Sequence, residues 1–131
     1  MIVRADHAGE LRFNLSSGRH DALTDQRPEY GGGDAGPMPS ELFLWSVAAC
    51  FGQSVAHVAR KMRTGLADLS LEVHGTKAEG SARFAQVRVV VEAGCEPERL
   101  QRIVTHAKKL CFVTNSISPT VEVLFESRAH P

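Results

Sequence analysis

Alternation of apolar and polar residues marks the strands of this chain. Residues 69–76 alternate regularly, which predicts a half-buried antiparallel strand, and a turn at 77–80 leads to a second strand over residues 82–93. Short strands are also expected near the amino terminus and after Pro119. Their predicted ranges are 2–5, 10–15, 20–24 and 121–126.

Two other stretches show the periodicity of helices. From Pro39, which suits the first turn of a helix, to about Arg63, the chain is apolar on every side in its first half. A helix that is apolar all round is buried on all sides, so we expect a sheet on one side and a second subunit on the other. After Pro97, apolar residues recur at three-and-four spacing as far as Leu110. Together the elements predict an α+β fold in one domain, residues 1–131.

A loop rich in glycine and proline separates the first strands from the first helix. Residues 26–39, QRPEYGGGDAGPMP, hold three prolines and four glycines. Such a composition neither continues a strand nor begins a helix before its end. Loops of ~12 to 15 residues without secondary structure are usually functional or disordered, so this one is a candidate wall of a site.

The charge and the apolar content of the chain limit which partners it is expected to bind and where in the cell it is expected to lie. The chain has 15 lysines plus arginines and 15 aspartates plus glutamates. It therefore lacks the excess of basic residues that would indicate binding to nucleic acid or to an anionic membrane. The first ten residues resemble neither a signal nor a transit peptide, which predicts a cytoplasmic location. The most apolar stretch, residues 42–59, is interrupted by polar side chains, which favours a buried helix over a membrane span.

Two of the three cysteines lie at the ends of helical segments. Cys50 shares a helix stripe with polar side chains, which indicates either the wall of a small pocket or a helix turning toward solvent. Cys111 ends the second helix on its apolar face and is expected to point inward. The residues alone leave open a redox pair or two unreactive core cysteines. The polar residues of the Cys50 stripe are Ser46, Ser54 and His57, with Gln53 at its edge.

The sequence contains no motif for other functions of cysteine, histidine or glycine residues. CxxC, HxH and HExxH are absent and the six histidines are scattered, so no metal is expected. The glycine cluster at residues 31–36 lacks the spacing of phosphate-binding loops, and no cofactor is expected. Cys95 precedes a proline turn and is interpreted as incidental.

The segment GGGDAGPMPSELFLWSVAACF, followed about sixty residues later by HAKKLCFVTN, resembles the OsmC/Ohr family. These are the osmotically inducible protein C and organic hydroperoxide resistance proteins. The resemblance covers nearly the whole chain. It implies an OsmC-like fold with antiparallel sheets around a central buried cysteine helix, in an intertwined homodimer.

The resemblance also implies a thiol-dependent peroxidase of the oxidative stress response. Cys50 matches the peroxidatic cysteine, Cys111 matches the resolving cysteine, and the implied partners are a small organic hydroperoxide and a dithiol reductant of the lipoyl type. A peroxidatic cysteine must be deprotonated, and an ordinary thiol is only a few per cent thiolate at pH 7. The family meets this need with an arginine, held by a glutamate, beside the cysteine.

The sequence departs from that motif in two places. The position ten residues before Cys50, where the family has its glutamate, holds Ser40, and Glu41 projects ~180° away from the cysteine. The hairpin turn that carries the family's arginine reads HAGE, with Arg4 and Arg12 nearest. These differences keep a second function open: an OsmC-like protein without peroxidase activity that binds a small apolar or thiol-reactive ligand in the dimer cleft.

Overall fold

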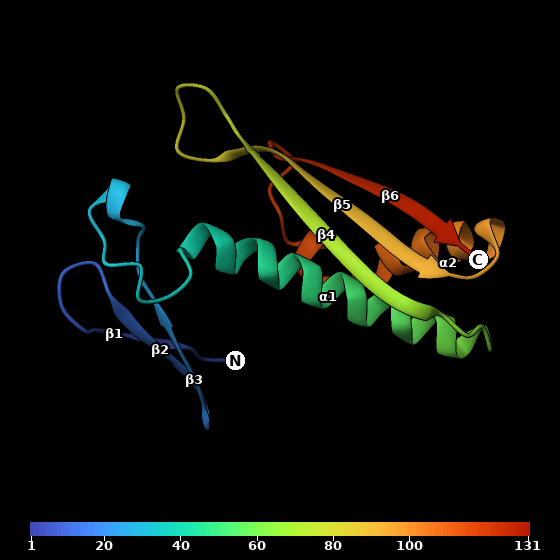
Figure 1. Cartoon of the computed structure of the whole chain (residues 1–131), viewed down its shortest axis with the longest axis horizontal. Helices are drawn as coiled ribbons and strands as arrows, with labels where there is room; N and C mark the ends of the chain where they lie inside the picture. The colour runs from blue at the N-terminus through green and yellow to red at the C-terminus, as the bar shows by residue number, and fades with distance from the viewer. The chain divides into compact units, whose positions relative to one another are not determined.

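The computed structural model describes residues 1–131, which divide into two units, Met1–Phe43 and Leu44–Pro131 (Figure 1). Each unit is described by itself, and the single domain expected from the sequence stays a prediction. The elements in chain order are β1 (Arg4–His7), β2 (Phe13–Ser17), β3 (His20–Thr24), the 3-10 helix η1 (Pro28–Tyr30), α1 (Pro39–Lys61), β4 (Ala67–Lys77), β5 (Phe84–Gly94), α2 (Pro97–Leu110), α3 (Phe112–Asn115) and β6 (Glu122–His130).

The amino-terminal unit holds an antiparallel sheet in the order β1-β2-β3. Its three strands confirm the sequence prediction, but β2 begins at Phe13 instead of at residue 10. The turn is longer than expected because the Ala8 N–H bonds to the Arg12 carbonyl at 2.9 Å and Glu10 has a positive φ of 49°. At the next turn Gly18 has a φ of 59°, a left-handed conformation that glycine adopts readily.

A buried carboxylate organises the glycine-rich loop. Asp25 is 1% exposed and accepts backbone N–H groups from Gln26 at 2.8 Å and from Gly33 and Ala35 at 3.1 Å each. The Ala35 N–H is the main cause that lowers the pKa of Asp25; burial opposes this shift, while the other two N–H groups and the charge of Arg12 favour it. The loop is therefore folded around an anion rather than held by an apolar core.

Two glycines of this loop allow close approach of backbone to backbone. A side chain at Gly32 would overlap the Gln26 carbonyl, and one at Gly36 would overlap the Leu23 carbonyl. The loop contains the short helix η1, which the sequence did not predict. The glycine content thus has a structural role in folding the loop back on itself.

The carboxy-terminal unit holds a sheet in the order β4-β5-β6. The predicted hairpin is confirmed, since β4 and β5 pair antiparallel, but β6 lies parallel to β5, with Gln86 opposite Glu122 and Gly94 opposite His130. The expectation of purely antiparallel sheets is therefore wrong for this strand. Its cause is the crossover through α2, which returns the chain to the start of β5 before β6 begins.

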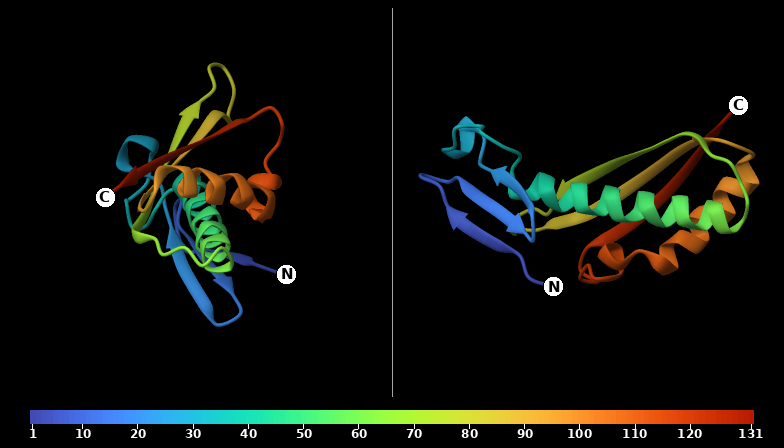
Figure 2. Two further views of the ribbon diagram at one scale, coloured as in Figure 1. Left: turned by 90° about the vertical axis from the view of Figure 1, so that its right-hand side faces the viewer. Right: turned by 90° about the horizontal axis from the view of Figure 1, so that it is seen from below.

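Both long helices cover one face of this sheet (Figure 2). The ring of Phe51 on α1 lies 4.6 Å from that of Phe125 on β6, and Ser127 on the same face donates to Gln101 of α2 at 2.7 Å. The opposite face carries ion pairs of β5 and β6, such as Arg88–Glu126 at 3.1 Å. The core residues between sheet and helices are Val47, Phe51, Val55, Val58, Val87, Val89, Val91, Ala93, Leu100, Ile103, Val104 and Ala107.

Helix α1 is buried on one face only within a single chain. Its outer face exposes Trp45, at 62%, together with Ala49 and Ala56. The expected burial on every side, which depends on a second subunit, stays a prediction. By length and composition α1 could also cross a membrane, a property that core helices of soluble proteins share, and 33% of its most apolar window is buried here.

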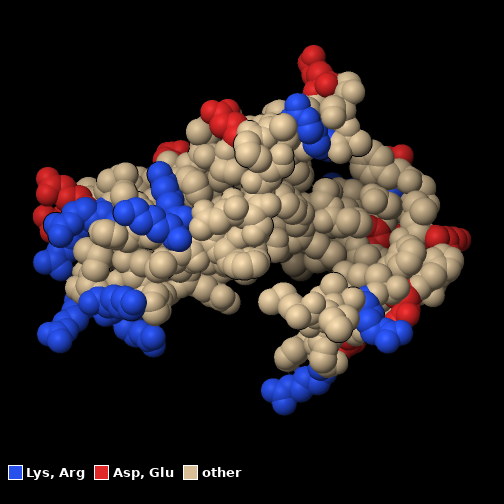
Figure 3. Space-filling view, turned by 180° about the vertical axis from the view of Figure 1, so that it is seen from behind, with Lys and Arg blue, Asp and Glu red and all other residues tan.

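Charge is distributed unevenly over the carboxy-terminal unit. Figure 3 shows lysine and arginine side chains gathered over the end of the unit where α1 ends and α2 begins. The last turn of α1 holds Arg60 and Lys61, and Arg63 follows directly. Cations at a helix carboxyl end interact favourably with the helix dipole.

Candidate functional site

Cys50 lies in the middle of α1 at the border between its buried and exposed faces. Its side chain is half-buried, and its carbonyl accepts the Ser54 hydroxyl at 2.9 Å. Of the polar stripe predicted around it, Ser54 is buried, whereas Gln53 and His57 are exposed. The polar stripe therefore extends from the buried face of the helix to its exposed face, and Cys50 lies between the two faces.

Cys111 joins two helices and is completely buried. It caps the carboxyl end of α2, where its N–H bonds to the Ala107 carbonyl at 3.1 Å. Its own carbonyl accepts the Asn115 N–H at 3.0 Å, so the same residue begins the short helix α3. Its backbone is extended, with φ −74° and ψ 102°, which turns the chain between the two helices. Its inward orientation, expected from the sequence, is confirmed by its exposure of 0%.

The fold brings the two thiols together. The Cys50 and Cys111 side chains are close enough for one thiol to act on the pKa of the other, and both are free cysteines. Burial raises the pKa of the Cys111 thiol above its ordinary value, and the neighbouring Cys50 thiol adds to that rise. Residues 61 positions apart in the sequence thus share one partly dry site.

Thr114 is a third member of this site that the sequence analysis missed. Its hydroxyl and its backbone N–H both act to lower the pKa of the Cys111 thiol. The hydroxyl also lies 3.4 Å from the Cys111 carbonyl. Because Cys111 begins a helical turn, the residue three positions later lies above it, so the C-x-x-T spacing is a signal that could have revealed this contact.

Glu41 is engaged within the amino-terminal unit. Its carboxylate accepts the Met38 N–H at 2.9 Å, as in a helix capping box, and pairs with the Arg27 guanidinium at 2.6 Å. The Met38 N–H is the main cause that lowers the pKa of Glu41, and the Arg27 guanidinium lowers it further. Arg27 was not among the arginines considered from the sequence. The sequence around the N-cap, M-P-S-E, carries the capping signal.

The two arginines nearest the family's motif differ in their surroundings. Arg4 lies exposed on β1, whereas Arg12 is half-buried and its Nε has no hydrogen-bond partner. Charge from Arg12 acts on Asp25. Neither arginine forms an ion pair with Glu41, which pairs with Arg27.

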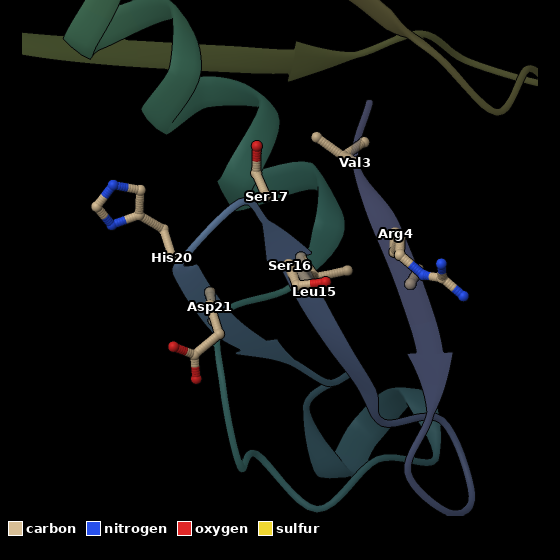
Figure 4. Close-up of a pocket in the computed structure, with 9 residues that line it drawn as sticks. Val3, Arg4, Leu15, Ser16, Ser17, His20 and Asp21 are labelled. Atoms are coloured by element: carbon tan, nitrogen blue, oxygen red, sulfur yellow. The ribbon is translucent and has the colours of Figure 1, made fainter. Parts of the chain in front are cut away.

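Other candidate groups have no reactive partner. Cys95 is half-buried, and its sulfur lies 3.5 Å from the Glu96 carbonyl. No cluster of three or more histidine, cysteine or acidic side chains could hold a metal ion. A hollow of about 400 Å³ on the sheet of the amino-terminal unit is lined from all three strands (Figure 4), among others by Val3, Leu15 and Ala22, and contains no cysteine.

Two neighbouring thiols, one half-buried and one buried, can exchange two electrons by forming a disulfide. The class of protein follows from the family model of the OsmC-like proteins, which matches residues 31–126. This chain belongs to that family. The matched range includes both cysteines of the pair, and the mixed α+β fold with two small sheets and three helices agrees with it.

Particular relatives are proteins of organic hydroperoxide resistance. The organic hydroperoxide resistance protein OhrB of Bacillus subtilis (strain 168) is 26% identical over 100 residues, covering 72% of this chain and 71% of that protein. The structure of the organic hydroperoxide resistance protein OsmC of Legionella pneumophila is 25% identical, with a TM-score of 0.75 over 96% of this chain and 94% of that one. The OsmC like protein of Mycoplasma pneumoniae, 14% identical, has a TM-score of 0.88 over 99% and 96% of the two chains and shows the fold alone.

Proposed function

We propose that this protein is a thiol-dependent peroxidase that reduces organic hydroperoxides, with Cys50 as the peroxidatic and Cys111 as the resolving cysteine. The observation that carries the proposal is the proximity of the two free thiols, the half-buried Cys50 beside the buried Cys111. Relationship to organic hydroperoxide resistance proteins supports the choice of substrate. The half-buried Cys50 is the cysteine of the pair that a substrate can reach, and the buried Cys111 is protected from direct oxidation.

The proposed cycle moves two electrons. The Cys50 thiolate attacks the outer oxygen of ROOH, the O–O bond breaks, and ROH leaves after the alkoxide takes up a proton. Cys50 is then a sulfenic acid. The Cys111 thiolate attacks its sulfur, forming the Cys50–Cys111 disulfide and releasing hydroxide, which becomes water. Proximity of the two sulfurs makes this step faster than oxidation by a second peroxide.

A dithiol of the lipoyl type is the reductant that suits this disulfide. Its first thiolate attacks one sulfur to give a mixed disulfide, and its second thiol closes a ring and leaves with both Cys50 and Cys111 reduced. The ring closure is intramolecular, so no second reductant must enter a partly dry site. We place this cycle in a cytoplasmic homodimer, in which the partner subunit would cover the exposed face of α1 and make the cysteine helix central.

A second candidate is an OsmC-like protein that binds a small apolar or thiol-reactive ligand without turnover. The observation that favours it is Ser40 in place of the family's glutamate, together with the engagement of Glu41 by Arg27 and Met38. A site without the activating pair would still present Cys50 to a ligand.

Mass spectrometry after oxidation separates the two candidates. Purified protein is treated with stoichiometric cumene hydroperoxide, and we expect a Cys50–Cys111 disulfide and catalytic peroxide consumption when dihydrolipoamide is added. Cys50→Ser should abolish both. Cys111→Ser should leave a Cys50 sulfenic acid that dimedone traps.

Cys95→Ser is the matched control, since it removes the third thiol and should preserve disulfide formation and turnover. Peroxide left unconsumed and both cysteines left reduced in the unaltered protein would contradict the peroxidase. Covalent capture of a thiol-reactive probe at Cys50 under those conditions would then favour the second candidate.

A further inference from the structure

A small pocket lies between the end of α1 and the first turns of α2. Its volume is about 160 Å³, and its walls are Met62, Thr64, Arg99 and Arg102. Arg99 Nη1 lies 3.5 Å from Thr64 Oγ1, so the two walls are joined by a hydrogen bond. Neither cysteine of the redox pair lines this pocket, so the site is independent of the proposed peroxidase.

The pocket lies among cations that have few partners. The side chain of Arg102 forms no hydrogen bond or ion pair, and the same is true of the side chains of Arg60, Lys61 and Arg63. Arg99 has one acidic partner: its Nε lies 3.6 Å from Glu96, with the two side chains 55% and 64% exposed. An ion pair so exposed and so long is weak, and an incoming anion can replace it.

The helix dipole explains only part of this cluster. Arg60, Lys61 and Arg63 lie at the carboxyl end of α1, where positive charge is favourable. Arg99 lies in the first turn of α2, where the helix is itself partly positive, so its charge is unfavourable there, and Arg102 follows in the second turn. They are also three residues apart on one helix face and repel each other. An anion between them would relieve both repulsions.

We propose that this pocket binds the phosphate group of a small soluble molecule. Two guanidinium groups provide several hydrogen-bond donors, which suits the several oxygens of a phosphate dianion better than the two of a carboxylate. The Thr64 hydroxyl donates to the Met62 carbonyl at 3.3 Å and accepts from Arg99, so it positions that guanidinium. Met62 offers an apolar wall to the carbon skeleton that carries the phosphate. The small volume and the zero net charge of the chain favour a soluble phosphate ester over the surface of an anionic membrane.

Isothermal titration calorimetry of the full chain tests this assignment at constant ionic strength. Inorganic phosphate and glycerol 3-phosphate are the probes, with chloride as reference, and we expect both phosphates to bind. Arg102→Gln should weaken binding about tenfold or more, because it removes a charge-assisted hydrogen bond in a partly enclosed site. Thr64→Val, which keeps side-chain volume, should weaken binding several-fold and serves where Arg102→Gln fails to fold, as judged by circular dichroism.

Arg19→Gln is the matched control, because it removes an exposed arginine from the turn between β2 and β3 and should leave phosphate binding unchanged. Equal loss of binding in Arg19→Gln and Arg102→Gln would overturn the proposal, since a general charge effect would then explain the binding. The absence of binding heat with either phosphate in the unaltered protein would also overturn the proposal. Sedimentation with phosphatidylglycerol vesicles, without binding of glycerol 3-phosphate, would assign the cluster to a membrane surface instead.

Discussion

Opposing effects act on the Cys111 sulfur. Burial and the neighbouring Cys50 raise the pKa of its thiol, while the hydroxyl and the N–H of Thr114 lower it. A resolving cysteine must attack as the thiolate, so any group that favours that form speeds closure of the disulfide. Thr114 therefore has a proposed positioning role, acting on Cys111 rather than on the peroxide.

Thr114→Val should slow disulfide closure at neutral pH. The substitution removes the hydroxyl, so the pKa of Cys111 should rise further and the pH profile of closure should move to higher pH. A hydrogen bond worth about 0.5–1.5 kcal/mol corresponds to a rate loss of roughly two- to tenfold. Stopped-flow measurement of closure after one equivalent of peroxide, from pH 6 to 9, gives the profile.

Thr114→Ser keeps the hydroxyl and should restore the rate of the unaltered protein. A Val variant with an unchanged pH profile, or a Ser variant as slow as the Val variant, would refute the positioning role. Apolar periodicity could predict the inward direction of Cys111, but α3 has only four residues and no periodicity, so only the C-x-x-T spacing pointed to the Thr114 contact.

At the scale of single elements, the carboxyl end of α1 carries an unusual residue. Arg63 has a φ of 51°, a left-handed conformation for which glycine is the usual choice. The Thr64 N–H bonds to the Ala59 carbonyl at 2.9 Å and the Arg63 N–H to the Arg60 carbonyl at 3.1 Å, the two bonds of a Schellman motif. A side chain in this conformation costs free energy that glycine would not.

Arg63→Gly should therefore raise the free energy of unfolding by about 0.5–1 kcal/mol, after allowance for the greater freedom of glycine in the unfolded chain. Chemical denaturation followed by circular dichroism measures the change. Arg60→Gly is the control: it removes the same charge within the helix, where the substitution should lower stability by about 1 kcal/mol. Destabilisation of similar size by both variants would show that charge, rather than backbone conformation, decides.

Periodicity predicted the elements better than their pairing. The ends of α1 follow from Pro39 and the basic residues near Arg63, and the β4–β5 hairpin follows from local alternation. The direction of β6 depends on how α2 crosses the sheet, which is a tertiary property that alternation in residues 121–126 does not encode. The contact of Cys50 with Cys111 likewise depends on packing of α1 and α2 on one sheet face.

For the whole molecule, the uncovered face of α1 is the feature that a single chain leaves unexplained. Trp45, Ala49 and Ala56 follow one exposed stripe of the helix. Small residues let two helices approach closely, and an exposed tryptophan is a frequent anchor of interfaces. The zero net charge adds no repulsion between copies. These features support contact between the α1 helices of two chains.

Trp45→Glu should convert the proposed homodimer to monomer. Loss of a tryptophan anchor typically costs about 2 kcal/mol or more, which raises the dissociation constant roughly 30-fold, and the new carboxylates would repel across the dimer axis. Sedimentation velocity over a range of protein concentrations measures the change. Leu124→Glu makes the same chemical change at a 38% exposed position on the other face of the β4-β5-β6 sheet and should leave the dimer intact. A monomeric unaltered protein, or equal dissociation of both variants, would contradict a dimer formed through α1. Contact with a second subunit would then not explain why this helix is apolar on every side.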